Sequence, residues 1–167
     1  MAFENGEKIE QRVNKHGKNY WKRVLGNSKW TGVTDIVIDP RNSDVLYAAT
    51  WDRHRTVAAY MGGGPGTAIY RSDNGGEFWK VLKNGLPNKP DSNNDGVVDE
   101  KDSPSLNMGK IGLAISSQNP DVVYAAIELH RTKGGVYRSE NRGESWKKMS
   151  NTVSGGTGPH YYQELYA

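Results

Sequence analysis

The sequence predicts an all-β fold built from two copies of a four-stranded unit, and three observations support this. Residues 70–82 and 137–149 are nearly the same segment, each with Tyr-Arg-Ser, a polar turn containing Asn and Gly, and Trp-Lys. An upstream segment also repeats, because residues 38–49 match residues 115–126 in their Asp-Val and Tyr-Ala-Ala positions. No segment has convincing helical periodicity, residues 11–18 being the best candidate. Since such a unit cannot bury its apolar face alone, we expect the copies to stack.

Each unit is expected to form four short strands. β-Branched and aromatic residues fill the runs, and Asn, Asp, Gly and Pro separate them. The strands expected in the first unit span residues 35–38, 45–50, 68–71 and 79–82, and those in the second span residues 111–115, 122–127, 135–138 and 146–149. Four antiparallel strands repeated with a Trp-bearing turn are typical of a propeller blade.

The turns resemble a known repeat family. The segments Ser72-x-Asn74-x-Gly76-x-Phe78-Trp79 and Ser139-x-Asn141-x-Gly143-x-Ser145-Trp146 resemble the Asp-box, or BNR, repeat Ser-x-Asp-x-Gly-x-Thr-Trp. From Tyr20 to Ala167 the chain resembles bacterial sortilin-like and glycosyl-hydrolase-type BNR repeat proteins. The resemblance implies a structural role for the Asp-box residues, and Asn in place of Asp keeps an acceptor for the turn amides. We expect Trp79 and Trp146 to be largely buried at equivalent places.

The repeat and the resemblance together divide the chain. The expected parts are an N-terminal segment at 1–25 ending in the last strand of a preceding blade (21–25), blade 1 at 31–86, an inserted loop at 87–105, blade 2 at 108–150, and the first strand of a following blade at 160–167. The predicted fold is therefore a fragment of a β-propeller, with two complete four-stranded blades and partial blades at both ends. Unpaired terminal strands favour self-association or pairing with missing parent blades.

The inserted loop carries a predicted calcium site, because residues 91–102 resemble an EF-hand or dockerin loop. The expected ligands, at the first, third, fifth, seventh, ninth and twelfth positions, are Asp91, Asn93, Asp95, the Val97 carbonyl, Asp99 and Asp102. Gly96 lies at the sixth position, where the sharp turn requires it. Alternating residues of a tight loop can direct several oxygens at one hard cation, so we expect one structural Ca²⁺. The alternative is an acidic linker, since prolines flank the loop where EF-hands have helices.

Strand direction places the long, irregular loops on one face of the blades, opposite the Asp-box turns. There, His54-Arg55-Thr56 corresponds to His130-Arg131-Thr132 in the second unit. The candidate ligand-binding residues on this face are Trp51, Arg53, His54, Arg55, Tyr60, His130, Arg131, His160 and Tyr161. Aromatic rings beside cations suit a carbohydrate or protein ligand. The alternative is that the arginines pair with carboxylates between blades. Residues 62–66, which contain four glycines, have no Lys such as a phosphate-binding loop requires. We expect them to let the backbone follow a tight path or to form a lid.

These features favour a non-catalytic binding or scaffold segment. The alternative is part of a secreted glycoside hydrolase, sialidase-like or xyloglucanase-like, whose active site is completed by missing blades. Such an enzyme needs two carboxylates across a bound sugar. Asp52 stands roughly where xyloglucanases place one catalytic Asp, and it is a weak candidate because no second acid is apparent.

Composition narrows the remaining classes. The absence of Cys excludes disulfides and thiolate metal sites. A net charge of +3 without a concentrated basic face argues against a nucleic-acid partner. No apolar run is long enough for membrane insertion, and residues 1–7 do not resemble a signal peptide. The family resemblance and the calcium loop imply an extracellular or bacterial periplasmic location.

Overall fold

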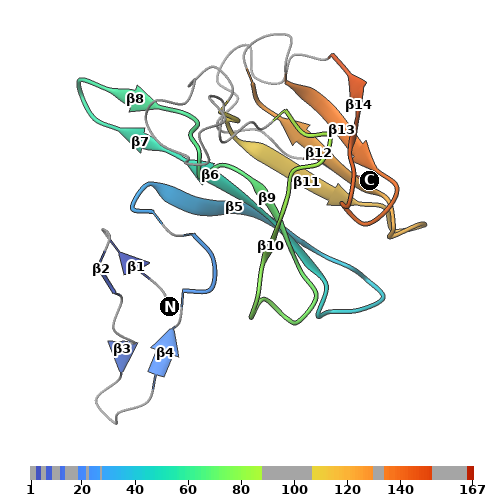
Figure 1. Ribbon diagram of the computed structural model, residues 1–167, viewed down its shortest axis with the longest axis horizontal. Helices are drawn as coiled ribbons and strands as arrows, with labels where there is room; N and C mark the ends of the chain where they lie inside the picture. The colour runs from blue at the N-terminus through green and yellow to red at the C-terminus, as the bar shows by residue number, and fades with distance from the viewer. Residues whose placement is uncertain are drawn as a thin grey trace.

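A computed structural model describes most of the chain. Among residues 1–22 it describes only the backbone of four short strands, which are Phe3–Glu4 (β1), Glu7–Lys8 (β2), Arg12–Val13 (β3) and Asn19–Trp21 (β4). The other described residues are 23–26, 28–87, 107–129, 134–151 and 165–167. These ranges contain antiparallel strands, turns and bends but no helix, so the all-β prediction is confirmed for them (Figure 1). They also hold no helix of the length and apolarity needed to cross a membrane.

The first repeat forms a four-stranded antiparallel sheet, here called sheet 1, with strand order β10-β9-β6-β5. Its strands are Thr31–Ile38 (β5), Leu46–Asp52 (β6), Ile69–Ser72 (β9) and Lys80–Leu82 (β10). Strand β5 begins earlier than predicted because Thr31 pairs with Asp52 across a register shift between Val33 and Asp35. A two-stranded hairpin, His54–Arg55 (β7) with Tyr60–Met61 (β8), follows sheet 1 within the segment predicted as a long loop.

The second repeat forms sheet 2, with strand order β11-β12-β13-β14. Its strands are Ile111–Ile115 (β11), Val123–Ile127 (β12), Gly135–Ser139 (β13) and Lys147–Ser150 (β14). All neighbouring strands in both sheets are antiparallel and follow one another in sequence order. Each repeat therefore gives one four-stranded meander. No closed ring is formed by the described residues.

The ends of the chain differ from the expected strands. β1 pairs with β2, and β3 pairs with β4. Of the strand expected at 21–25, only Trp21 lies in a strand, since residues 23–26 have no strand and Gly26 has a φ of 89°, typical of a turn. Of the strand expected at 160–167, residues 165–167 lie in no strand and residues 160–164 fall outside the described ranges.

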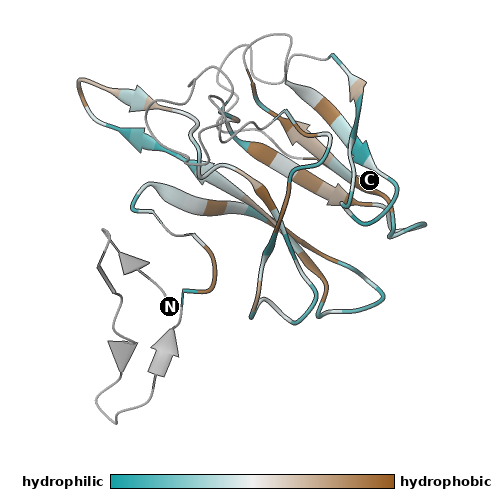
Figure 2. Cartoon of the chain, in the orientation of Figure 1, coloured by the Kyte–Doolittle hydropathy of each residue, from teal (hydrophilic) through white to brown (hydrophobic). Residues whose placement is uncertain are grey.

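The hydrophobic core lies between the two sheets. Alternate residues of a strand point to opposite faces, so each sheet offers one set of apolar side chains to the other. The buried core residues are Val45, Tyr47, Ala49, Ile69, Leu82, Leu86, Met108, Ile111, Leu113, Val123, Ala125, Ile127, Tyr137 and Trp146. Figure 2 shows the apolar stretches along the facing strands. Burying each large apolar side chain contributes about 1.5–3 kcal/mol.

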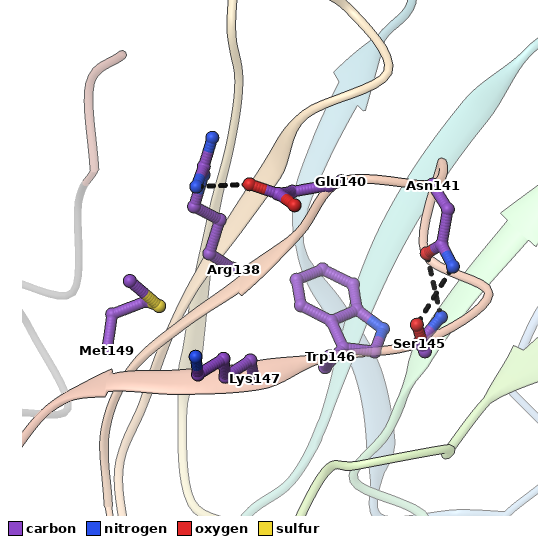
Figure 3. Close-up of a pocket in the computed structure, with 7 residues that line it drawn as sticks. All are labelled: Arg138, Glu140, Asn141, Ser145, Trp146, Lys147 and Met149. Carbon is purple, nitrogen blue, oxygen red and sulfur yellow. Dashed lines mark hydrogen bonds and ion pairs between the residues drawn. The ribbon is translucent and has the colours of Figure 1, made fainter.

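The two Asp-box turns share the hydrogen bonds accepted by their Ser and Asn side-chain oxygens. In the second turn the Ser139 hydroxyl accepts from the Gly143 amide at 2.8 Å. The Asn141 side-chain oxygen accepts from the Ser145 amide at 2.9 Å, and Figure 3 shows these two residues. The equivalent distances in the first turn are both 2.9 Å. Gly76 and Gly143 have φ angles of 89° and 85°, a conformation that disfavours a side chain. Asn therefore supplies the acceptor that these turns require.

The two tryptophans that follow these turns differ in burial. Trp146 is 6% exposed, and its indole nitrogen donates to the Gly143 carbonyl at 3.0 Å. Trp79 is only half-buried, and its indole nitrogen has no partner in the described part of the chain. The expectation of equal burial is wrong for Trp79. The two turns have different neighbours, since the turn before Trp146 lies on sheet 1 and the turn before Trp79 has no such neighbour among the described sheets.

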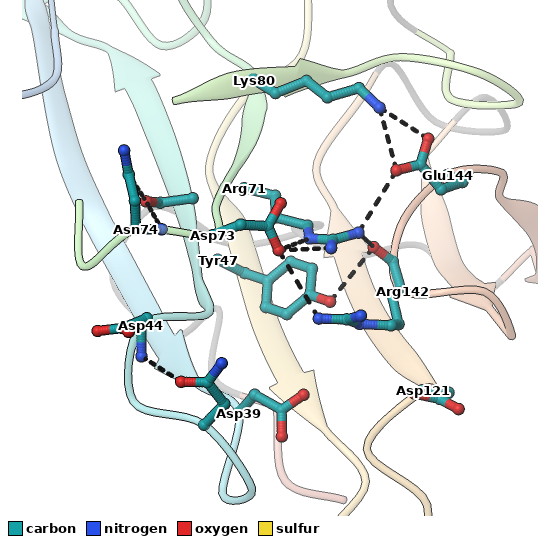
Figure 4. A network of polar contacts seen from close by, with 12 residues as sticks. Asp39, Asp44, Tyr47, Arg71, Asp73, Asn74, Lys80, Asp121, Arg142 and Glu144 are labelled. Carbon is teal, nitrogen blue, oxygen red and sulfur yellow. Dashed lines mark hydrogen bonds and ion pairs between the residues drawn. The ribbon is translucent and has the colours of Figure 1, made fainter. Parts of the chain in front are cut away.

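Polar contacts hold the second turn on sheet 1 (Figure 4). The Arg142 carbonyl accepts from the Tyr47 hydroxyl at 3.2 Å and from Nη1 of Arg71 at 3.1 Å. The Glu144 carboxylate pairs with Lys80 at 2.8 Å and with Arg71 at 3.4 Å. Burial raises the pKa of Tyr47, which keeps its hydroxyl a donor, and the hydrogen bond from Lys80 lowers the pKa of Glu144, which keeps it ionised. We call Tyr47, Arg71 and Lys80 the turn clamp.

Replacing Ser139 by alanine is expected to destabilise the protein by about 1–3 kcal/mol, because the buried Gly143 amide would lose its acceptor. Ser139 is 1% exposed. Urea unfolding measures the change, with Ser117→Ala, at an exposed turn position, as the matched control. Equal midpoints for the two variants would show that the Ser139 hydroxyl does not organise the turn.

Candidate ligand-binding rim

The structure describes part of the predicted ligand face. Trp51 lies at the end of β6, and the β7–β8 hairpin projects from that end of sheet 1 (Figure 1). His54 and Arg55 form one strand of this hairpin, and Arg55 pairs with Tyr60 on the other. The remaining predicted residues, His130, Arg131, His160 and Tyr161, lie outside the described residues. The predicted correspondence between the two His-Arg-Thr segments therefore stays a prediction.

Two residues that the sequence analysis missed join this edge. The Trp30 and His54 rings stack with centroids 3.7 Å apart and planes tilted by 44°. The Lys29 ammonium lies 4.3 Å above the Trp30 ring. The Arg53 amide donates to the Trp30 carbonyl at 3.0 Å, which continues the pairing of β5 with β6 by one residue. Extending the first strand toward the N-terminus would have placed Trp30 beside His54.

Trp51 is buried, unlike the other predicted ligand-face residues that the structure describes. Its indole nitrogen donates to the Gly62 carbonyl at 2.9 Å, and the Arg53 guanidinium lies 5.3 Å from its ring centroid. Its ring therefore supports the edge and positions Arg53. By contrast, Trp30 is 38% exposed and Tyr60 is 50% exposed. We call the exposed and half-buried group Lys29, Trp30, Arg53, His54, Arg55 and Tyr60 the basic aromatic rim.

Asp52, the weak catalytic candidate, is buried beneath the glycine-rich loop. Its Oδ1 accepts from the Thr31 hydroxyl at 2.5 Å, and its Oδ2 accepts from the Gly66 amide at 2.7 Å. A side chain on Gly64 or Gly66 would collide with this carboxylate. Asp52 therefore links the glycine-rich loop to sheet 1, because its Oδ2 binds Gly66 while its Oδ1 binds Thr31 of β5. A glycosidase acid must instead reach a bound sugar.

The predicted calcium loop is not described. All of its ligands, Asp91, Asn93, Asp95, Val97, Asp99 and Asp102, lie outside the described residues. Within the ranges that are described, no group of three or more His, Asp or Glu residues could hold a metal ion. The calcium site therefore stays a prediction from the sequence.

Comparisons with known proteins give distant structural matches alone. No family model matches the sequence, and no curated protein matches it. Among solved structures, the chain is similar to the GH74 enzyme of Niastella koreensis, with 17% sequence identity and a TM-score of 0.23. The match covers 71% of this chain and 22% of that enzyme's chain. Similarity at this level assigns neither a family nor an activity.

Proposed function

We propose that this chain is a non-catalytic binding segment of a β-propeller whose basic aromatic rim binds an anionic carbohydrate. The observation that carries the proposal is the collection of cations and exposed rings at one end of sheet 1. Residues 28–34 and 51–66 contain Lys29, Arg53 and Arg55 but only one acid, Asp52. Because Asp52 is buried and bonded on both oxygens, it leaves the positive charge of the rim open to a ligand anion.

The rim suits an anionic sugar for two physical reasons. The exposed rings of Trp30 and Tyr60 offer apolar area against which the face of a sugar ring can stack. Arginine presents several donors in a planar fork, which matches the oxygens of a carboxylate or sulfate. Arg53 and Arg55 are both exposed; Arg55 pairs with Tyr60 in the hairpin, and the Arg53 amide donates to the Trp30 carbonyl. A neutral sugar could stack on the rings but would gain nothing from the charges of the arginines.

Calorimetric titration of the protein with an oligogalacturonate and with a neutral xylo-oligosaccharide tests the proposal. We expect tighter binding of the acidic ligand, weakening as salt rises because exposed charges are screened. Trp30→Ala and Arg55→Ala should each weaken this binding about tenfold, which corresponds to about 1.4 kcal/mol. Val57→Ala, at the exposed tip of the hairpin, is the control and should bind as the unmutated protein does.

Three outcomes would contradict this proposal. Equal affinity for acidic and neutral ligands would remove the role of the arginines. Full affinity in both rim variants would place binding elsewhere. Release of new reducing ends from either ligand, lost in Asp52→Asn, would show that the chain is catalytic.

We also propose that residues 91–102 bind one structural Ca²⁺, which fits an extracellular or periplasmic protein. Calcium should raise the melting temperature, since a ligand that binds only the folded state stabilises it by mass action. Asp95→Ala should abolish the effect by removing a ligand oxygen, whereas Ser92→Ala, at a non-ligand position of the loop, should retain it. Calorimetry that detects no binding at millimolar calcium would show that the loop is a linker.

A further inference from the structure

The outer face of sheet 2 repeats the surface with which sheet 1 holds its neighbour. In sheet 1, Tyr47 pairs with Arg71 and Arg71 pairs with Lys80, so the turn clamp lies across three strands. In sheet 2, Tyr124 pairs with Arg138 and Arg138 pairs with Lys147 in the same way. Because facing residues of paired strands share one face, these three counterparts also form a single cluster. Sheet 2 therefore carries a second copy of the turn clamp, formed by Tyr124, Arg138 and Lys147.

The first clamp is occupied, and its copy is open. Leu82, beside the first clamp, is 3% exposed and packs against Gly143 of the second turn. Its counterpart Met149 is 52% exposed. The Arg138 guanidinium pairs with Glu140 through Nη1, as Arg71 pairs with Asp73 in sheet 1. Within the described part of the chain its buried Nε atom nevertheless has no partner, and the Tyr124 hydroxyl and the Lys147 ammonium have no hydrogen bond.

A hollow of about 280 Å³ lies at this copy of the clamp. It is lined by Arg138, Glu140, Asn141, Ser145, Trp146, Lys147 and Met149 (Figure 3). The corresponding place on sheet 1 is filled by the turn that carries Arg142 and Glu144. The first clamp therefore shows what kind of group the second clamp can bind. It is a turn whose backbone carbonyl is followed two residues later by a carboxylate.

Sheet 1 carries a turn of this shape. Gly75 and Glu77 stand where Arg142 and Glu144 stand in the repeat, and the two turns share the hydrogen bonds accepted by their Ser and Asn side-chain oxygens. Glu77 is exposed and has no side-chain partner among the described residues. The outer face of the same sheet is uncovered at β5, since Ile36 is 52% exposed whereas its counterpart Leu113 is 2% exposed.

We propose that the outer face of sheet 2 binds the turn at residues 75–77 of a second copy of this chain. Tyr124 and Arg138 donate to the Gly75 carbonyl of the second copy, and Lys147 pairs with its Glu77. Donors on sheet 2 and acceptors on sheet 1 make the two surfaces complementary in charge as well as in shape. The contact joins two different surfaces, so successive copies add head to tail, as a ring or a filament. This interface is independent of the basic aromatic rim.

Sedimentation velocity over a hundredfold concentration range tests the interface by charge reversal. The unmutated protein should form larger species as its concentration rises. Lys147→Glu and Glu77→Lys should each weaken this association at least tenfold, because like charges then face one another across the contact. The double variant restores the opposite-charge pair and should associate as the unmutated protein does. Both side chains are exposed, so all variants should keep the same urea midpoint within error at a concentration low enough for the unmutated protein to be monomeric.

Arg55→Glu supplies the matched control, since it reverses an exposed charge on the rim and should leave association unchanged. A monomer at every concentration would overturn the proposal. Association that resists both single reversals, or a double variant no better than the single ones, would also overturn it. A loss of association in Arg55→Glu would place the contact at the rim instead.

Discussion

Replacing Trp146 by alanine is expected to lower the free energy of unfolding by about 3–5 kcal/mol, the range for deleting a large buried aromatic. The Trp146 ring belongs to the core between the sheets, and its backbone amide donates to the Asn84 carbonyl at 2.9 Å. The substitution removes the ring from the core and leaves the Gly143 carbonyl without its indole donor. Urea unfolding followed by circular dichroism measures the loss.

Trp79→Ala is the internal control for this prediction, because Trp79 occupies the same place in the first repeat. Its cost should be smaller than that of Trp146→Ala, since the Trp79 ring is half-buried and its indole nitrogen makes no hydrogen bond within the described ranges. Equal costs would show that the two sheets have equivalent surroundings in solution. A cost near zero for Trp146→Ala would contradict the packing of sheet 2 on sheet 1.

Replacing Gly85 by alanine should destabilise the protein by about 3 kcal/mol, because two penalties act together. Gly85 has a φ of 82°, a conformation that costs a residue with a Cβ atom about 1–2 kcal/mol. The added methyl group would also collide with the Trp146 carbonyl, and overpacking costs about 1–3 kcal/mol. Backbone atoms cannot move aside as a flexible side chain does.

Gly32→Ala is the matched control, since a Cβ atom on Gly32 in β5 would meet nothing within 4 Å and the residue has no positive φ. Its unfolding free energy should stay within about 0.5 kcal/mol of the unmutated protein. Thermal or urea unfolding of the two glycine variants side by side measures the difference. A Gly85→Ala protein as stable as the Gly32 variant would show that the connection after β10 does not press against Trp146.

The repeat predicted the two sheets well because local chemistry sets their strands and turns. Ser139, Asn141 and Gly143 fix the turn through side-chain hydrogen bonds and a positive φ, and both signals are visible in the sequence. The start of β5 was missed because residues 31–34 have no strong apolar alternation and become a strand only by pairing with the end of β6. The β7–β8 hairpin was missed because its strands have two residues each.

The make-up of the candidate rim was less visible in the sequence than the fold. Arg53, His54 and Arg55 were predicted from their residue types, but Lys29 and Trp30 join them only through strand pairing that the sequence analysis placed too late. Trp51 carries the right chemistry for a ligand face and is nevertheless buried, because its indole nitrogen binds the glycine-rich loop. The contacts between the sheets depend on which face of each sheet is covered, and the repeat alone does not specify this.

The second Asp-box turn sits on the face of sheet 1, so the two repeats stack in one direction. A nuclear Overhauser contact between the Tyr47 ring and the Gly143 α-protons tests this claim most directly. A Cβ atom built on Gly143 would lie 3.5 Å from Cε1 of Tyr47, and an α-proton points in that direction. We predict a strong cross-peak between the Tyr47 ε-protons and Gly143. Its absence, with both residues assigned and the strands of each sheet formed, would contradict the stacking.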